Sequence, residues 1–203
     1  DTRRFRVGYI EIPKKNGKML DVRTPLLSLD ESTGLRRWTT IGGIRAGDKV
    51  FHPDGHPVTV VAKSEVMDHE RCFRLSFSQT DETIVAGENH LWETSCDQFA
   101  GTSLYTGIRK TIDIFREVRL NGRPSHTVRE STDGRSRSKS RQITDVVEVP
   151  KVSCQCIQVD SGDGMFLVGE SLIPTHNSTL MSGMGLMLML ADHEPSAEVY
   201  IAA

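Results

Sequence analysis

The sequence predicts an all-β protein built from short strands, and three observations favour this fold class. Gly and Pro, present 17 and 8 times, divide the chain into short segments. Several segments are rich in β-branched residues, which suit pleated strands. The turn signal Pro53-Asp54-Gly55 separates two of them and indicates a tight hairpin. The 203 residues suffice for one or two domains with one sizeable core.

The expected elements follow the chain in order. Helical pieces are expected at residues 40–50, at residues 111–121 and after residue 177. The second of these has Thr111 as its expected cap and Gly122 as its end. Strands are expected at residues 5–9, 25–29, 49–51, 58–62, 72–77, 83–85, 145–149, 156–159, 166–168 and 198–201.

Residues 121–142 differ from the rest in composition. They are rich in Ser, Arg, Gly and Thr, and Val128 is their only branched aliphatic residue. Such a segment buries too little apolar surface to offset the entropy lost on ordering, so we expect a flexible surface loop. Contact of its arginines with nucleic acid is the alternative, although a run of charges is usually solvated.

An interrupted phosphate-binding loop divides the chain. Residues 13–18 read Pro-Lys-Lys-Asn-Gly-Lys, and the Ser-Thr that should follow stands far downstream at residues 178–179. Removal of residues 19–177 would join a strand, a Gly-Lys-Ser-Thr turn and a helix, which is the arrangement that binds nucleotide phosphates. Ile12 replaces the first Gly of the usual pattern. We therefore expect two flanks, residues 1–18 and 178–203, around a removable segment.

The downstream junction carries residues that can break a peptide bond. An Asn side-chain amide can attack its own main-chain carbonyl, which cleaves the chain after Asn177 and forms a succinimide. A neighbouring imidazole, here His176, lowers the barrier by proton transfer, and the Ser178 hydroxyl can receive an acyl group. Taken alone, the three residues also fit an ordinary loop that precedes a helix cap. Their position at the interrupted loop favours the chemical interpretation.

The upstream junction, Lys18-Met19, has no nucleophile at its first residue. A thioether has no ionisable proton, so Met19 cannot attack the preceding carbonyl. Either this step is blocked or the nucleophile comes from elsewhere in the chain. Cys154 and Cys156 are the competing thiols nearby in sequence, and a free thiol with a pKa of about 8.5 needs activation near neutral pH.

The segment from Met19 to Asn177 resembles an intein, the self-excising element of protein splicing. The residues that carry this resemblance lie in short blocks at 24–27, 38–42, 46–50, 88–92, 156–160, 166–168 and 174–177. A non-nucleophilic first residue together with Trp92, Cys156 and Thr175 resembles the class 3 inteins, which are marked by a Trp-Cys-Thr set. No homing-endonuclease sequence is evident, so the segment looks like a mini-intein. The flanks resemble the ATPase domain of a phage terminase large subunit.

The resemblance implies an all-β, horseshoe-shaped intein (Hint) fold with short helices and both junctions in one cleft. It implies autocatalytic splicing in which Cys156 attacks the Lys18-Met19 bond, Ser178 accepts the acyl group and Asn177 cyclises. The sequence departs from the family pattern in two places. Gly87 occupies the position of the usual Thr, and Gly164-Met165 fill the stretch where a His is often found. The implied catalytic residues are Cys156, His90, Asn177, His176, Ser178, Trp92 and Thr175, and the junction residues are Lys18, Met19, Asn177 and Ser178.

Cofactors and partners follow from the same interpretation. Splicing needs neither a cofactor nor ATP, and the Cys154-x-Cys156 spacing is unlike common zinc patterns, so we expect no metal. The partners are the chain's own flanks, while the host protein is expected to act on phage DNA with ATP. The formal charge of −2 gives no general attraction to nucleic acid or to a membrane. We expect a cytoplasmic monomer with four reduced cysteines, encoded by a bacterium or a phage.

Two other classes stay open at this point. One is an ATPase fragment of the terminase type with a stable insertion that never leaves. The other is a self-cleaving domain of the hedgehog type, which transfers its acyl group to an outside acceptor. That class normally attacks with a first-residue Cys and lacks a terminal His-Asn-Ser. The intact mass of the expressed chain would discriminate among the three.

Overall fold

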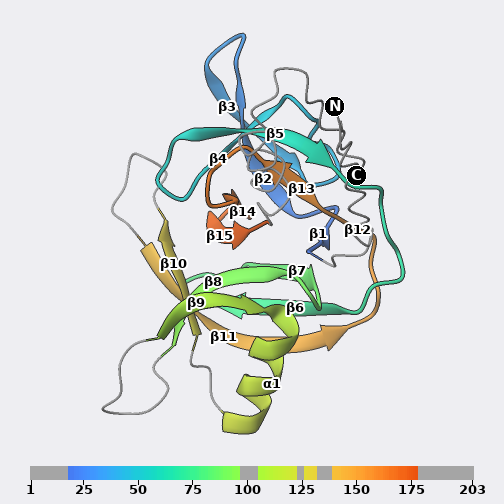
Figure 1. Cartoon of the computed structure of the whole chain (residues 1–203), viewed down its shortest axis with the longest axis vertical. Coiled ribbons are helices and arrows are strands. Elements are labelled where there is room, and N and C mark those ends of the chain that lie inside the picture. The colour runs from blue at the N-terminus through green and yellow to red at the C-terminus, as the bar shows by residue number, and fades with distance from the viewer. Residues whose placement is uncertain (1–17, 97–104, 123–125, 132–138, 178–203) are drawn as a thin grey trace, which may run out of the picture. The chain divides into compact units, whose positions relative to one another are not determined.

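The computed structural model describes residues 18–96, 105–122, 126–131 and 139–177 (Figure 1). These residues belong to one compact unit, Gly17–Leu180. The elements within them are β1 (Leu20–Asp21), β2 (Pro25–Asp30), β3 (Leu35–Thr40), β4 (Lys49–Phe51), β5 (Pro57–Lys63), β6 (Cys72–Phe77), β7 (Thr83–Gly87), β8 (Leu91–Cys96), β9 (Tyr105–Lys110), α1 (Thr111–Asn121), β10 (His126–Ser131), β11 (Lys139–Val149), β12 (Cys154–Gln155), β13 (Ile157–Val159), β14 (Met165–Val168) and β15 (Ile173–His176).

The described strands form two antiparallel sheets. The larger has ten strands in the order β12-β1-β7-β6-β11-β10-β8-β15-β14, with β9 paired to β8. The smaller has five strands in the order β13-β5-β4-β2-β3. Figure 1 shows the smaller sheet above the β6 to β11 part of the larger one, with β14 and β15 between them. The Gly169 N–H donates to the Pro25 carbonyl at 2.8 Å and ties the end of β14 to the smaller sheet.

The larger of two hydrophobic clusters in the described residues runs through both sheets. Trp92, Phe73 and Leu75 are among its largest fully buried side chains. Alternation explains the pattern, because in β8 every second residue from Trp92 is buried while its neighbours are partly exposed. The expected β4–β5 hairpin is present, and Gly55 adopts φ 88° in its turn, a conformation that favours Gly. The all-β prediction is confirmed for the described part of the chain.

The single helix of the described residues covers one side of β6 and β11. Ile114 is fully buried, and the Phe115 ring lies 5.0 Å from the Phe73 ring, measured between centroids. Thr111 is the first helical residue, and the cap is Lys110, without a side-chain hydrogen bond. The assignment of Thr111 as the cap was therefore wrong by one residue. Gly122 ends the helix in a left-handed conformation at φ 65°, as expected.

Two other sequence expectations need correction. The flexible loop assigned to residues 121–142 is wrong where β10 and the start of β11 lie, because these strands pair with each other and β10 also pairs with β8. The composition of the segment does not predict these strands, because their stability comes from neighbouring strands in the sheet. Between β3 and β4, residues 41–43 and 46–47 form turns, and the Ile44 N–H donates to the Thr40 carbonyl at 3.0 Å, but no helix extends over residues 40–50. The strands expected at residues 5–9 and 198–201, and the helix after residue 177, lie outside the described residues.

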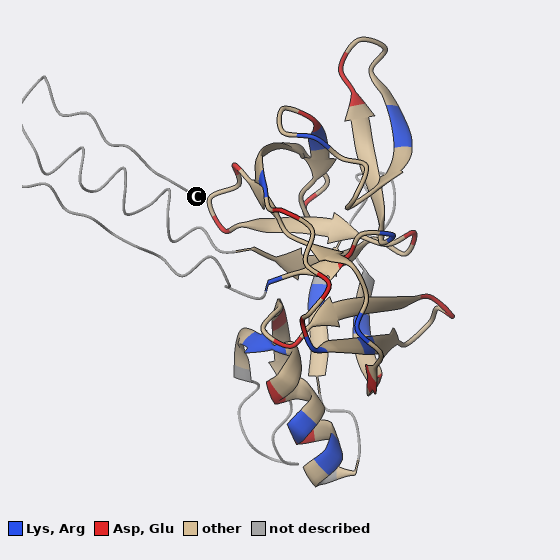
Figure 2. Ribbon diagram, turned by 90° about the vertical axis from the view of Figure 1, so that its right-hand side faces the viewer, with Lys and Arg blue, Asp and Glu red and all other residues tan. Residues whose placement is uncertain are grey.

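Charged residues of both signs are interleaved over the described ribbon rather than collected on one face (Figure 2). Arg71 and Glu148 pair across β6 and β11 at 2.6 Å, and Arg129 contacts Asp54, Glu93 and Asp163 at 3.0–3.3 Å. A search of the described helical residues finds no stretch with the length and apolar character of a membrane span.

Candidate functional site

The pairing of β1 with β12 brings the upstream junction beside Cys156. The register joins Leu20 to Gln155 and Asp21 to Cys154 in an antiparallel pair. Continued by one residue, this register places Met19 opposite Cys156, so the Lys18-Met19 peptide lies alongside the thiol-bearing residue. The Met19 side chain is 2% exposed and packs with Cys154, and Cys156 packs against the same cluster. The Met19 carbonyl accepts from the Gly87 N–H at 2.8 Å.

Cys156 is a half-buried thiol held by its main chain. Its N–H donates to Ser64 Oγ at 3.0 Å, and its carbonyl accepts from the Ser64 N–H at 2.9 Å. Its Sγ donates to Asn177 Oδ1 at 3.5 Å. Burial raises the pKa of the Cys156 thiol to about 11, and the positive charge of Lys18 opposes this rise. The thiol is therefore protonated at neutral pH.

The two neighbouring thiols differ in their surroundings. Cys154 is fully buried, and its Sγ lies 3.7 Å from the Sγ of Cys72. Burial raises the pKa of Cys154, and the nearby Cys72 reinforces the rise. Cys154 therefore has no exposed surface for a reaction, whereas Cys156 is partly accessible. The geometry favours Cys156 over Cys154 as the reactive thiol.

Asn177 reaches Cys156 from the end of β15. Its N–H donates to the Gly164 carbonyl at 2.8 Å, and its Nδ2 donates to the Ile157 carbonyl in a close contact. Together with the contact to the Cys156 sulfur, these bonds fix the side-chain amide from both ends. Asn177 thus lies against the chain segment that contains Cys156.

His90 lies just before β8 and is almost fully buried. Its Nε2 makes a short hydrogen bond with Thr175 Oγ1, and its ring lies 5.0 Å from the Trp92 ring, measured between centroids. Burial lowers the pKa of His90 to about 3, and a main-chain contact with Lys18 opposes this shift. The Lys18 main chain therefore lies near the ring. Within the described chain, Nδ1 has no hydrogen bond of ordinary geometry and is the nitrogen free to face that main chain.

Trp92 and Thr111 support the His90 loop through hydrogen bonds. Trp92 is fully buried, and its Nε1–H donates to Thr111 Oγ1 at 3.0 Å. The Thr111 N–H in turn donates to the His90 carbonyl at 2.9 Å. The indole is therefore a support for the His90 main chain as well as a neighbour of its ring.

His176 is the last residue of β15 and is mostly buried. It pairs with Met165 of β14 and with Leu91 of β8. Burial lowers the pKa of His176 and the charge of Lys18 lowers it further, while Asp163 raises it. The ring is therefore neutral near pH 7, with one nitrogen that can accept a proton.

The structure brings most of the expected site residues together. Contacts or pairing join Cys156, Asn177, His90, Trp92, Thr175, His176, Lys18 and Met19 into one region. Ser178 lies outside the described residues. Sequence reasoning missed Ser64 as the support of Cys156 and gave Thr111 only a capping role. No local signal could have found them, because Ser64 is 92 residues from Cys156 in sequence and Thr111 is 19 from Trp92.

Comparison with solved structures identifies the family. The crystal structure of the Msm DnaB1 intein splicing domain bound with zinc matches at a TM-score of 0.57 and 30% identity, covering 78% of this chain and 99% of that one. The MchDnaB-1 intein matches at a TM-score of 0.57 and 30% identity, with the same coverage of both chains. The gp41-1 intein, at 0.54 and 18% identity, shares the fold. This chain belongs to the intein family, has the all-β Hint fold and contains a protein-splicing domain.

The curated relatives are replicative DNA helicases. The replicative DNA helicase DnaB of Mycobacterium leprae is 34% identical over 164 residues, which is 81% of this chain and 25% of the helicase. The chain therefore spans about a quarter of that relative's length. A comparison with protein-family profiles finds no match.

Proposed function

We propose that this chain splices by the class 3 route, excising residues 19–177 and joining Lys18 to Ser178. The single observation that carries the proposal is the β1–β12 register, which sets Cys156 opposite the first residue after the upstream junction. Because Met19 has no nucleophile, a thiol placed there is the group that can attack the Lys18 carbonyl. The reaction is a single turnover of the chain on itself.

The first step transfers the upstream flank to sulfur. Cys156 Sγ forms a thioester with the Lys18 carbonyl carbon, the Lys18-Met19 bond breaks, and the Met19 nitrogen gains a proton. His90 is the proposed proton relay, since Nδ1–H can donate to the Met19 nitrogen while Nε2 takes a proton from the Thr175 hydroxyl. That hydroxyl regains a proton from the thiol. Proximity of this kind can supply about 7–11 kcal/mol of the barrier.

The later steps use the downstream junction. The Ser178 hydroxyl attacks the thioester, which moves the upstream flank onto oxygen and restores the Cys156 thiol. Asn177 Nδ2 then attacks its own carbonyl and breaks the bond to Ser178, with His176 shuttling the proton. The freed Ser178 nitrogen attacks the ester and forms an ordinary peptide bond. Cyclisation pulls the earlier, reversible exchanges forward because the excised product leaves.

The hydrogen bonds of Asn177 suggest how the order of steps is kept. Its amide oxygen accepts from the Cys156 thiol and its Nδ2 donates to the Ile157 carbonyl, so both ends of the amide have partners other than the Asn177 main chain. Formation of the thioester removes the S–H donor and loosens one of these two contacts. Asn177 is thereby held back until the first acyl transfer has occurred. This arrangement favours splicing over premature cleavage at Asn177.

The proposed host is a nucleotide-hydrolysing protein whose phosphate loop is restored by splicing. The flanks resemble a phage terminase large subunit, whereas the curated relatives are replicative DNA helicases, so the shared class is an ATPase that acts on DNA. The intein itself needs no cofactor, and its partners are its own flanks. A thiol nucleophile fits the reducing cytoplasm, and the proposed state is a monomer.

Substitution of the thiol tests the proposal directly. Cys156→Ala should abolish the branched species and the joined flanks, because no other group can attack Lys18, while slow cleavage after Asn177 persists. Intact mass spectrometry of the expressed chain measures all of these products. Cys96→Ala, which removes a buried thiol outside the site, should still splice. Normal joined flanks from Cys156→Ala would remove Cys156 from the mechanism.

A further inference from the structure

We propose that Cys96, Glu117 and His126 form a Zn²⁺ site separate from the splicing residues. They come from β8, α1 and β10, and one ligand atom of each lies within 4.8 Å of the other two. Cys96 and His126 are buried, and Glu117 is half-buried. The splicing mechanism uses none of the three.

The sheet register places the first two ligands on one face. His126 lies directly opposite Cys96 in the antiparallel pairing of β10 with β8. Side chains in such opposed positions have Cβ atoms about 4.5–5.5 Å apart and point to the same side of the sheet. Glu117 reaches this pair from the helix, with its Oε2 2.8 Å from His126 Nε2. Three separate elements therefore converge on one point.

The second nitrogen of His126 has a partner suited to orient a metal ligand. Nδ1 lies 3.2 Å from the Thr94 hydroxyl, which can accept a hydrogen bond from Nδ1–H. In the metal-bound state, that tautomer would leave the Nε2 lone pair for the cation. Metal-bound histidines typically donate their other N–H to such a neighbour, which fixes the ring. A cation between Nε2 and the carboxylate would take the place of the proton that joins them now.

The donor set matches Zn²⁺ better than it matches other common cations. A thiolate, an imidazole and a carboxylate are the N, S and O donors of zinc sites, whereas Mg²⁺ and Ca²⁺ take oxygen ligands. The two negative donors balance the charge of the ion. Tetrahedral coordination with bonds of about 2.0–2.3 Å needs ligand atoms roughly 3.5 Å apart. The group needs to contract by about 1 Å at its widest, and water would be the fourth ligand.

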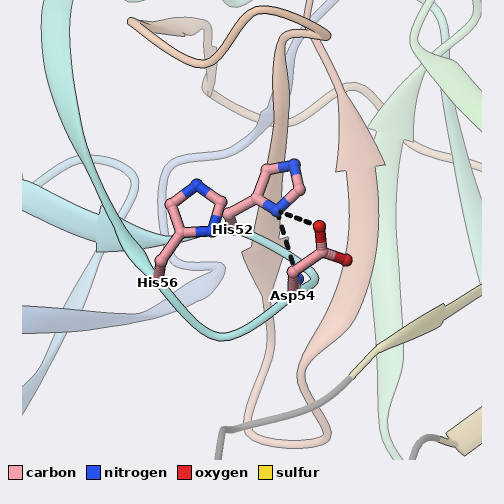
Figure 3. A group of neighbouring side chains, drawn as sticks. All are labelled: His52, Asp54 and His56. Carbon is pink, nitrogen blue, oxygen red and sulfur yellow. Dashed lines mark hydrogen bonds and ion pairs between the residues drawn. The ribbon is translucent and has the colours of Figure 1, made fainter.

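A second group of possible ligands, His52, Asp54 and His56 in the β4–β5 turn, is less suited (Figure 3). The His52 Nδ1 lone pair already accepts from the Asp54 N–H at 3.1 Å. His52 Nε2 faces the Asp163 carboxylate at 3.1 Å, and Asp54 pairs with Arg129 at 3.3 Å. His52 Nε2 is thus engaged by a carboxylate outside the group, whereas His126 Nε2 is engaged by a member of its own group. Arg129 also lies closer to Asp54 than Arg109 lies to Glu117, at 3.9 Å. This group serves as the matched control.

The test uses the full chain carrying Cys156→Ala, which blocks splicing and removes that thiol as a competing ligand. Zn²⁺ is titrated by calorimetry, and Co²⁺ by its absorption spectrum, in which a thiolate-to-cobalt charge-transfer band reports sulfur ligation. We expect one equivalent of either ion and a charge-transfer band. Added Cys96→Ser or His126→Gln should weaken binding by at least tenfold, and added His56→Gln should leave it unchanged.

Several outcomes would contradict the proposed Zn²⁺ site. They are the absence of Zn²⁺ binding, a Co²⁺ complex without the thiolate band, a band that survives Cys96→Ser, and loss of binding with His56→Gln alone. Urea unfolding checks that each variant is folded. If Cys96→Ser or His126→Gln fails to fold, the presence or absence of the thiolate band in the parent, with His56→Gln as comparison, decides the question.

Discussion

The Cys156 thiol is protonated at neutral pH, and the charge that lowers its pKa belongs to Lys18, the residue just before the bond that we propose is cleaved. Burial raises its pKa to about 11, while the charge of Lys18 lowers it. The effect is reciprocal, because the Cys156 sulfur raises the pKa of Lys18, which burial lowers. In the proposed mechanism, a residue of the upstream flank therefore contributes to activation of the thiol that removes it. The same lysine belongs to the interrupted phosphate loop.

A pH profile of the first acyl transfer tests this coupling. Since the folded pKa of Cys156 lies well above neutrality, its thiolate fraction rises about tenfold per pH unit between pH 7 and 9, and the rate should rise with it. Lys18→Met removes the charge that lowers this pKa and should slow the step about two- to tenfold at pH 7.5. The rate is measured as thiol-induced release of residues 1–18 in a chain carrying Asn177→Ala and Ser178→Ala.

Two controls accompany the Lys18 measurement. Lys18→Arg keeps the charge and should retain most of the rate, and Lys151→Met removes an exposed lysine and should change nothing. A Lys18→Met rate equal to that of the parent would show that the charge plays no part in activating Cys156.

β8 links the chemistry to the rest of the sheet. It carries Trp92, follows His90 directly, and pairs with β9, β10 and β15. The Trp92–Thr111 hydrogen bond fastens it to the start of α1 within the core. The position of His90 therefore depends on a strand and a helix whose contact is long range.

Thr111→Val tests the value of that contact. The change preserves the shape of the side chain but leaves the buried Trp92 Nε1–H without its partner, which should lower the free energy of unfolding by about 1–3 kcal/mol. It should also slow thioester formation, because the His90 loop loses its support. Urea unfolding of the splicing-blocked chain measures the first effect. The exposed Thr106→Val in β9 is the control, and an equal loss of stability in both variants would contradict the role of Thr111.

Elements with a strong local pattern could be predicted, and elements that depend on partners could not. The bounds of β4 and β6 match the expected strands, because each has a run of apolar or β-branched residues between turn signals. β10 was missed because its stability comes from pairing with β8 and β11 on either side. The helix was found from Ile112, Phe115 and Val118, but its cap was placed one residue late.

The candidate site follows the same division. Asn177 and His176 were proposed from their position at the interrupted loop, and Trp92, Cys156 and Thr175 only through family resemblance. The Ser64 and Ile157 contacts depend on pairing between distant segments, which single-sequence patterns do not contain. The Cys96, Glu117 and His126 group likewise joins three elements with no motif in common.

The whole unit brings together two junctions that are far apart in sequence. The pairing of β1 with β12 positions the upstream junction, and the pairing of β15 with β14 and β8 positions Asn177. Cys156 lies between the two. The β1–β12 register, continued by one residue, places it opposite Met19, and its sulfur contacts Asn177. Splicing in this account is a consequence of that convergence.

Mapping the acyl group in a trapped intermediate tests the central claim most directly. In a chain carrying Asn177→Ala and Ser178→Ala, the upstream flank cannot move beyond the first nucleophile. Peptide mass spectrometry should find residues 1–18 attached to Cys156 through a bond that hydroxylamine or dithiothreitol cleaves, and addition of Cys156→Ala should abolish the adduct. An adduct on another residue, or a cleavable adduct that persists without Cys156, would contradict the account.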